Sequence, residues 1–295
     1  MVSFCIKNNN QNTIKYLLKN IELINLDNIH FCEKKFSKYN NIILHYTGKS
    51  VSIFYNELAN VLCKSIIELY EPQILKKMLY LNYFYFEPED IDIISKSCKN
   101  LLNTASDKHN LQFTKNNYPS VNYNDRKISL WASVLKYITS HKSMVLDGFI
   151  TFRTFDYLSY LDNAIDNAVN QFVIDKEYFD FINLLKLYID AKPSLTDLVH
   201  LIYINGESIL LDKNQNIISI TKNAINLNYL SDISFSSNDY ALNSLLSLLP
   251  KKIIIHLVSE EDEFINTLKL IFGSSVTTCT DCTLCHTYKI LNNVK

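Results

Sequence analysis

The residues of this chain best suited to chemistry stand together in the octapeptide CTDCTLCH, residues 279–286. Cys279, Cys282 and Cys285 recur at every third position, and His286 follows directly. Thiolates act as nucleophiles, as redox groups and as ligands of soft metal ions. Short Cys-x-x-Cys steps also let several sulfurs converge on one ion or cluster. The octapeptide is therefore the first place to expect a functional site.

A metal site is the first interpretation of these three cysteines. Zinc takes four tetrahedral ligands of sulfur and nitrogen, so one more ligand is needed. His286 suits this poorly because side chains of adjacent residues diverge, which leaves Cys5, Cys32 or a remote histidine. An iron–sulfur cluster fits less well, since the fourth cysteine and the proline of ferredoxin-like runs are missing. Zinc is the favoured cofactor, ahead of iron–sulfur.

Three other interpretations of the octapeptide stay open. A redox dithiol is one, although thioredoxin-like proteins place such a pair where a strand leads into a helix, and residues 287–295 are few for that. Covalent haem attachment fits the C-x-x-C-H spacing literally but requires an exported chain. Finally, the three thiols can have no chemical role and serve only as small, partly buried side chains at the end of a strand.

Composition narrows the class of protein. Of 295 residues, 47% are hydrophobic and 20% charged, so a sizeable core can form. The net charge of −1 gives no basic field for nucleic acid or anionic membranes. No signal peptide and no apolar run near the ~20 residues that span a bilayer are visible. We therefore expect a cytoplasmic protein with reduced cysteines and no membrane association.

Glycine is scarce, with four in the whole chain, so the glycine-rich loops that cradle phosphates are absent. The G-x-S-x-G turn of many hydrolases is absent too. The sequence thus contains no recognisable catalytic set, and whether the chain catalyses a reaction stays open.

The elements that position the cysteines follow from hydrophobic periodicity. We expect a mixed α+β and α/β fold with three parts. These are a small N-terminal α/β unit over 1–48, a helical region over 49–192 with a loop or boundary near 103–126, and a C-terminal α/β domain over 196–295 that ends in the cysteine cluster.

The C-terminal domain has the clearest pattern. Asn205-Gly206 predicts a β-hairpin. Strands at 233–235, 253–258 and 276–279 then alternate with helices at 239–249 and 260–272, and Ser259 with Asp262 suggests a capping box. This β-α-β-α-β order implies a parallel sheet with right-handed crossovers. Ligands bind beyond the carboxyl ends of such strands, and Cys279 stands at one of them, where helix N-termini favour thiolates.

An arginine and an aromatic run each have a functional interpretation and a simpler structural one. Arg153 is one of two arginines in a chain that otherwise uses lysine, so it is a candidate ligand-binding residue for an anion. A structural salt bridge to Asp156 or Asp147 is the simpler account. The aromatic run YLNYFYF at 80–86 can stack nucleic-acid bases, but packed core or a buried strand is the favoured interpretation.

Several segments resemble one family. The stretches DGFITFRTFDYL, FVIDKEYFDFINLLKLYID and VHLIYINGESILLDKNQNI together resemble the YtxC-like family of proposed sporulation proteins, and the ending FGSSVTTCTDCTLC is similar to that family's ending. The resemblance implies an intracellular protein of a spore-forming, low-GC Gram-positive bacterium. It implies a role in sporulation and carries no established activity.

The resulting expectation is a non-enzymatic interaction or regulatory factor that acts through a protein partner and holds a metal at its terminal cysteines. The alternative is a thiol-dependent enzyme that uses Cys282 or Cys285 at the carboxyl edge of the C-terminal sheet. A second alternative is a single-stranded nucleic-acid binder that uses the aromatic run.

Overall fold

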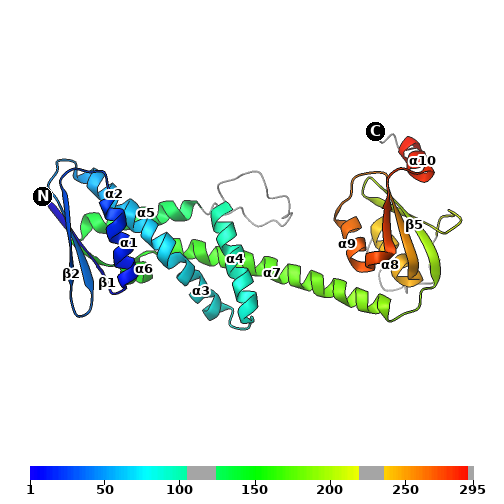
Figure 1. Ribbon diagram of the computed structural model, residues 1–295, viewed down its shortest axis with the longest axis horizontal. Coiled ribbons are helices and arrows are strands. Elements are labelled where there is room, and N and C mark those ends of the chain that lie inside the picture. Colours follow the sequence, from blue (N-terminus) through cyan, green and yellow to red (C-terminus); the bar gives the residue numbers. More distant parts are fainter. Residues whose placement is uncertain (105–123, 219–235, 292–295) are drawn as a thin grey trace. The chain divides into compact units, whose positions relative to one another are not determined.

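The computed structural model describes residues 1–104, 124–218 and 236–291 of the chain (Figure 1). Within these residues, helices accompany two four-stranded sheets, which confirms the predicted mixed α+β fold. The chain divides into two compact units, Met1–Val173 and Ile174–Lys295. In the described part of the chain, every helix is too short or too polar to cross a membrane.

The first unit is built on a sheet with the strand order β2-β3-β1-β4. Strand β1 runs antiparallel to β3 and parallel to the short β4. Asn10 caps the first helix by accepting from the backbone N–H of Asn12 and Thr13. The elements are β1 (Val2–Asn8), α1 (Gln11–Glu22), β2 (Ile29–Lys35), β3 (Asn40–Tyr46), α2 (Val51–Ser65), a π-helical turn (Ile66–Tyr70), α3 (Glu71–Asn82), α4 (Pro88–Thr104), α5 (Asp125–Ser140), β4 (Ser143–Val145), α6 (Leu146–Arg153) and the first half of α7 (Phe155–Asp190).

One hydrophobic core holds this unit together. It joins the sheet, through Phe4 and Ile42, to helices on which Leu58, Leu130 and Leu161 are fully buried. Large apolar side chains buried in this way each stabilise the folded state by about 1.5–3 kcal/mol. The division into three regions over 1–48, 49–192 and 196–295 stays a prediction.

The second unit carries a sheet with the strand order β6-β5-β7-β8, in which β5, β7 and β8 are parallel and β6 is the antiparallel edge. Asn205 and Gly206 join β5 to β6 with φ angles of 50° and 83°, as a tight hairpin requires. The elements are β5 (Thr196–Ile204), β6 (Glu207–Leu211), α8 (Ser237–Leu248), β7 (Pro250–Leu257), α9 (Glu263–Phe272), a 3₁₀ turn (Gly273–Ser275), β8 (Val276–Cys279) and α10 (Thr283–Leu291).

The two faces of this sheet pack against different partners. Side chains alternate along each strand, so Leu201 and Ile255 face α8, α9 and the end of α7 in one core. Ile202 lies on the opposite face, in a smaller cluster to which Tyr288 of α10 belongs. The second face is the one on which the terminal cysteines gather.

Several local predictions were wrong. Helix α9 begins at Glu263 with Asp262 as its N-cap, whereas the Ser259 hydroxyl accepts from Asn205 N–H. Residues 283–291 form helix α10, although residues 287–295 alone are few for a helix.

The aromatic run is not a packed strand. It ends α3 and turns into α4, with Phe84 79% and Tyr85 63% exposed. Tyr83 is partly buried and donates a hydrogen bond to the Asp166 carboxylate. Apolar composition predicted burial here, but at a helix-to-helix turn only some of the side chains can face the core. The strand expected at 233–235 and most of the loop expected at 103–126 lie outside the described residues.

Candidate metal centre

The centre begins with two neighbouring strands. His256 on β7 and Cys279, the last residue of β8, are register partners in the parallel ladder. Partners at one level of a parallel sheet point to the same face. His256 is 4% exposed although it interrupts the apolar run of residues 253–258. The sheet thus places an imidazole beside the first of the three thiols.

Helix α10 supplies the other two thiols. Cys282 directly precedes this helix, and Cys285 lies in its first turn with its side chain fully buried. The backbone N–H of Cys285 points at the Cys282 sulfur at 3.5 Å, which satisfies one of the free donors at the helix start. The turn between β8 and α10 therefore returns the chain toward the sheet face that carries His256.

The four ligand atoms lie close enough together to surround one ion. Their distances are all within 4.8 Å. Cys282 Sγ is 3.3 Å and Cys285 Sγ 3.6 Å from His256 Nδ1. Cys285 Sγ is 3.6 Å from Cys282 Sγ and 4.0 Å from Cys279 Sγ. A tetrahedral zinc with sulfur at about 2.3 Å and nitrogen at about 2.0 Å separates its ligands by about 3.5–3.8 Å. The cluster can hold a metal ion.

A second histidine orients the first. His200 Nδ1 on β5 lies 2.9 Å from His256 Nε2, and both rings are buried. His256 Nδ1 faces the sulfurs, so a metal bound there leaves Nε2 as the protonated nitrogen, which donates to His200. Such a hydrogen bond fixes the tautomer and the ring orientation of a metal-binding histidine.

The pKa shifts of His256 and Cys282 favour the protonation states in which these side chains bind a metal ion. Burial, and then the neighbouring His200, lower the pKa of His256, which favours the neutral imidazole that binds metals. Burial works against the Cys282 thiolate, but hydrogen bonds from the Cys285 backbone N–H and from the thiols of Cys285 and Cys279 hold the Cys282 pKa below its ordinary value. Burial raises the pKa of Cys285 to about 12 in the metal-free chain.

The remaining sequence candidates for the fourth ligand lie elsewhere. His286 Nε2 contacts the Asp281 carboxylate at 2.6 Å rather than the cluster. Cys5 and Cys32 belong to strands of the first unit and are not among the four clustered residues. Of the options left open by the sequence, the remote histidine is the one that the structure brings to the thiols.

The two arginines have opposite environments. Arg153 is exposed, and within the described residues it forms no ion pair with Asp147 or Asp156, so the expected salt bridge is absent. Its role in binding a ligand stays a prediction. Arg126, at the end of the loop predicted over 103–126, is fully buried and binds Glu71 through Nε at 3.1 Å and Nη2 at 3.2 Å. The planar guanidinium of Arg126 thus binds both carboxylate oxygens of Glu71.

Arg126 is the centre of a polar cluster inside the first unit. Its Nη1 donates to the carbonyl oxygen of Leu102 at 2.8 Å, and the Tyr157 hydroxyl donates to Glu71 at 2.8 Å. These contacts connect α3, α4, α5 and α7. Because each charge is paired and hydrogen-bonded, burial is tolerated.

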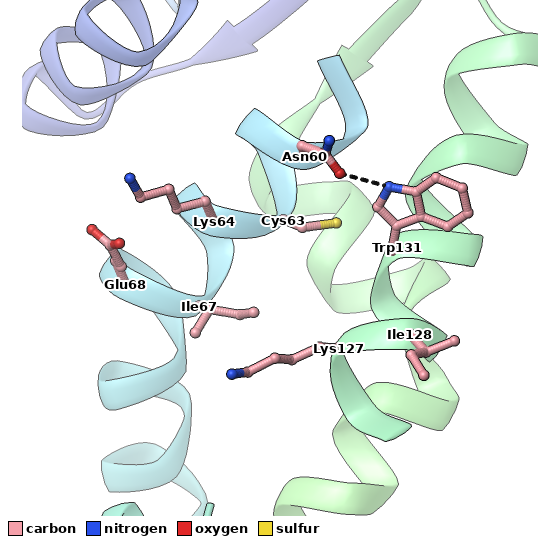
Figure 2. Close-up of a pocket in the computed structure, with 8 residues that line it drawn as sticks. All are labelled: Asn60, Cys63, Lys64, Ile67, Glu68, Lys127, Ile128 and Trp131. Carbon is pink, nitrogen blue, oxygen red and sulfur yellow. Dashed lines mark hydrogen bonds between the residues drawn. The ribbon is translucent and has the colours of Figure 1, made fainter. Parts of the chain in front are cut away.

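A pocket of about 510 Å³ lies between α2, the π-helical turn and α5 (Figure 2). Cys63 and Ile67 point toward α5, and Trp131 closes one end by donating to Asn60 at 2.9 Å. Burial raises the pKa of Cys63 to about 12, so this thiol stays protonated at neutral pH. The pocket therefore does not provide the thiolate that a cysteine-dependent enzyme needs.

Comparison with known proteins shows the family of this chain. The model of the YtxC-like family matches residues 56–277, about three quarters of the sequence. The chain belongs to the YtxC-like family. His200 and His256 lie inside the matched range, whereas the three cysteines of the centre follow it.

One curated relative illustrates the distance within the family. The "Uncharacterized protein YtxC" of Bacillus subtilis (strain 168) is 23% identical over 129 residues, which cover 44% of this chain and 46% of the relative. The match thus spans about half the length of that protein. No solved structure matches the chain.

Proposed function

We propose that the C-terminal unit is a protein-interaction module whose fold is held by one structural zinc ion. The observation that carries this proposal is the convergence of His256, Cys279, Cys282 and Cys285 on one point. Structural zinc sites use four protein ligands, whereas catalytic sites keep one position for water or substrate. Three thiolates and one imidazole complete a tetrahedron, which favours zinc over an iron–sulfur cluster held by four cysteines.

The proposed site would join the last elements that the structure describes. Strand β8 has only four residues and pairs along one side with β7. Helix α10 has nine residues, fewer than an isolated helix needs for stability in water. An ion bound to β7, β8 and α10 at once would join all three, and the binding free energy of structural zinc acts as folding free energy.

A structural role is also consistent with how the thiols are engaged. In the proposed site all three sulfurs are metal ligands, which leaves no uncoordinated thiolate to serve as the catalytic nucleophile of an enzyme. The rival is the thiol-dependent enzyme that uses Cys282 or Cys285. That rival predicts metal-free protein with one thiol that reacts unusually fast with iodoacetamide.

The exposed aromatic turn supports a protein partner rather than nucleic acid. Phe84 and Tyr85 stand at the tip between α3 and α4, and the neighbouring Tyr83 binds the Asp166 carboxylate. Carboxylates close to the aromatic side chains repel a phosphate backbone. We propose a cytoplasmic protein partner and no nucleic acid. A binding titration with a single-stranded oligonucleotide at low salt tests this, and saturable binding that Phe84→Ala abolishes would contradict it.

Membership of the YtxC-like family supports a role in sporulation, which we include in the proposal. Deleting the gene in a spore-forming host should lower the count of heat-resistant spores. The wild-type gene should restore the count, and a gene carrying Cys279→Ser, Cys282→Ser and Cys285→Ser together should not. A deletion strain with normal sporulation would remove this part of the proposal.

The metal itself is tested by elemental analysis of protein purified without added metal or chelator. We expect one zinc per chain in the wild type and in Cys32→Ser, which changes an exposed cysteine of the first unit. The triple serine variant should hold none. Wild-type protein that is folded, reduced and free of zinc, even after zinc is added, would refute the structural metal site.

A further inference from the structure

We propose that Cys282 and Cys285 form a peroxide-sensitive dithiol, and that its oxidation to a disulfide releases the zinc ion and frees helix α10. This inference rests on the proposed zinc site and assigns it a regulation. The choice of these two thiols follows from where the three cysteines lie relative to helix α10 and to the sheet of the second unit.

Cys282 and Cys285 are the two thiols best placed to form a disulfide. Their sulfurs are 3.6 Å apart, and a disulfide of about 2.05 Å requires them to approach by about 1.5 Å. Both residues belong to the single turn that opens α10, so rotation of the side chains achieves this without separating backbone elements. Cys279, in contrast, is held at the end of β8 by its pairing with β7.

Exposure decides the order of events. Cys282 is partly exposed, whereas the Cys285 side chain is fully buried between α10 and the sheet. A small oxidant in solution therefore reaches Cys282 before Cys285. Cys279 is also partly exposed, but its sulfur lies 4.0 Å from Cys285 Sγ, whereas Cys282 Sγ lies at 3.6 Å, so Cys285 is better positioned to resolve a product formed on Cys282. Sensor cysteines that oxidise reversibly combine access with an adjacent resolving cysteine in this way.

The reaction balances with hydrogen peroxide as the oxidant. The Cys282 thiolate attacks one peroxide oxygen, the O–O bond breaks, and a sulfenic acid and a hydroxide form. The Cys285 thiolate then attacks the sulfenic sulfur, the S–S bond forms, and a second hydroxide leaves. Two protons from solvent convert the hydroxides to water. Two electrons have passed from the two sulfurs to peroxide.

Oxidation removes half of the ligands. The ion would keep only Cys279 and His256, and a disulfide sulfur is a far weaker ligand than a thiolate. Helix α10 would then be held by few contacts, chiefly Tyr288 in the small apolar cluster and Lys289 Nζ on the carbonyl oxygen of Thr280 at 3.1 Å. Its release would uncover Ile202 and its neighbours on that sheet face.

The test starts from full-length protein shown to contain zinc. A slight excess of hydrogen peroxide is added with a chromogenic zinc chelator present, followed by mass spectrometry of alkylated peptides. We expect one zinc released per chain, a mass lower by two hydrogens and a disulfide that joins Cys282 to Cys285. Reduction with dithiothreitol and added zinc should restore the original state.

Two results separate the proposals. Protein that contains no zinc before peroxide is added refutes the metal site itself. Zinc that stays bound under a large excess of peroxide refutes the switch alone. Zinc release accompanied by sulfinic acids, or by a disulfide to Cys279, refutes it as well.

Cys32→Ser serves as the control and should behave as the wild type, because Cys32 lies outside the cluster. Increased hydrogen exchange over 283–291 after oxidation would report the freed helix.

Discussion

His256 Nδ1 lies 3.3 Å from Cys282 Sγ, although 26 residues separate the two in the sequence. One comes from a buried central strand, and the other precedes a short helix near the end of the described chain. The pairing of β7 with β8 and the turn into α10 bring them together. The site is therefore a product of the tertiary fold, and its occupancy should depend on that fold and contribute to it.

Removing the metal should loosen one end of the second unit. Treatment of the zinc-loaded protein with a strong chelator is expected to increase hydrogen exchange over 276–291, because β8 and α10 lose their shared ion. Exchange in α2, which belongs to the first unit, should not change and serves as the internal control. Equal exchange in 276–291 with and without zinc would show that the ion does not hold these elements.

His200 should affect zinc binding without touching the ion. His200→Leu removes the partner of His256 Nε2 while keeping an apolar volume in the sheet face. Loss of a hydrogen bond to a metal-binding histidine typically costs 10–100-fold in affinity, and we expect a decrease of about that size in competition with a chelator. His286→Leu is the matched control, since His286 pairs with Asp281 outside the cluster. An unchanged affinity in His200→Leu would contradict the orienting role.

The sequence identified three of the four residues of this site and could not supply the fourth. Three cysteines at every third position predict convergent thiols regardless of fold, and the structure brings them together. The fourth member depends on which strand pairs with β8, which local pattern does not reveal. A signal did exist, because His200 and His256 each interrupt a buried apolar strand. Helix α10 escaped prediction because nine residues seldom form a helix without tertiary contacts.

The buried ion pair in the first unit should be costly to break. Arg126→Met leaves Glu71 buried without its partner, and such changes cost about 3–5 kcal/mol. Urea unfolding followed by the fluorescence of Trp131, the single tryptophan of the chain, measures the first unit. The double variant Arg126→Met, Glu71→Leu should recover much of the loss, since an apolar pair of similar volume replaces both charges.

Arg153→Met is the natural control for this experiment. It removes the second arginine of the chain from an exposed position, where substitutions usually change the free energy of unfolding by less than about 0.5 kcal/mol. If Arg153→Met destabilised the first unit as much as Arg126→Met, the assignment of the structural arginine would be wrong.

Asp162 should make the first unit depend on pH. Burial, and then the nearby Asp166, raise the pKa of Asp162 above its ordinary value of 3.8. The folded chain therefore binds this proton more tightly than the unfolded chain. Its contribution to stability is complete below pH 3.8 and is lost as the pH rises through the raised pKa. Asp162→Asn should thus stabilise the first unit at pH 7 and leave it nearly unchanged at pH 3.

The expected gain at pH 7 is about 0.2–0.5 kcal/mol, the size of a like-charge contact at i and i+4 on a helix. Unfolding of both proteins at the two pH values, followed by Trp131 fluorescence, measures it. Asp180→Asn removes an exposed carboxylate of the same helix and controls for the change in net charge. A stabilisation that is the same at pH 3 and pH 7 would not come from this carboxylate.

The fold itself was predictable where pattern and turn chemistry agree. Asn205-Gly206 located the hairpin, and Gly273, with its φ of 51°, ended α9 where expected. Prediction failed where burial depends on distant partners. The burial of Arg126 depends on Glu71, 55 residues away, and the exposure of Phe84 depends on how α3 and α4 meet the rest of the unit.

X-ray absorption at the zinc edge of the purified, reduced protein tests the central claim most directly. Three sulfur neighbours at about 2.3 Å and one nitrogen neighbour at about 2.0 Å are expected in the wild type, with the nitrogen contribution lost or replaced in His256→Cys. A spectrum with only oxygen and nitrogen neighbours, or a protein with no zinc to measure, would contradict the proposed centre.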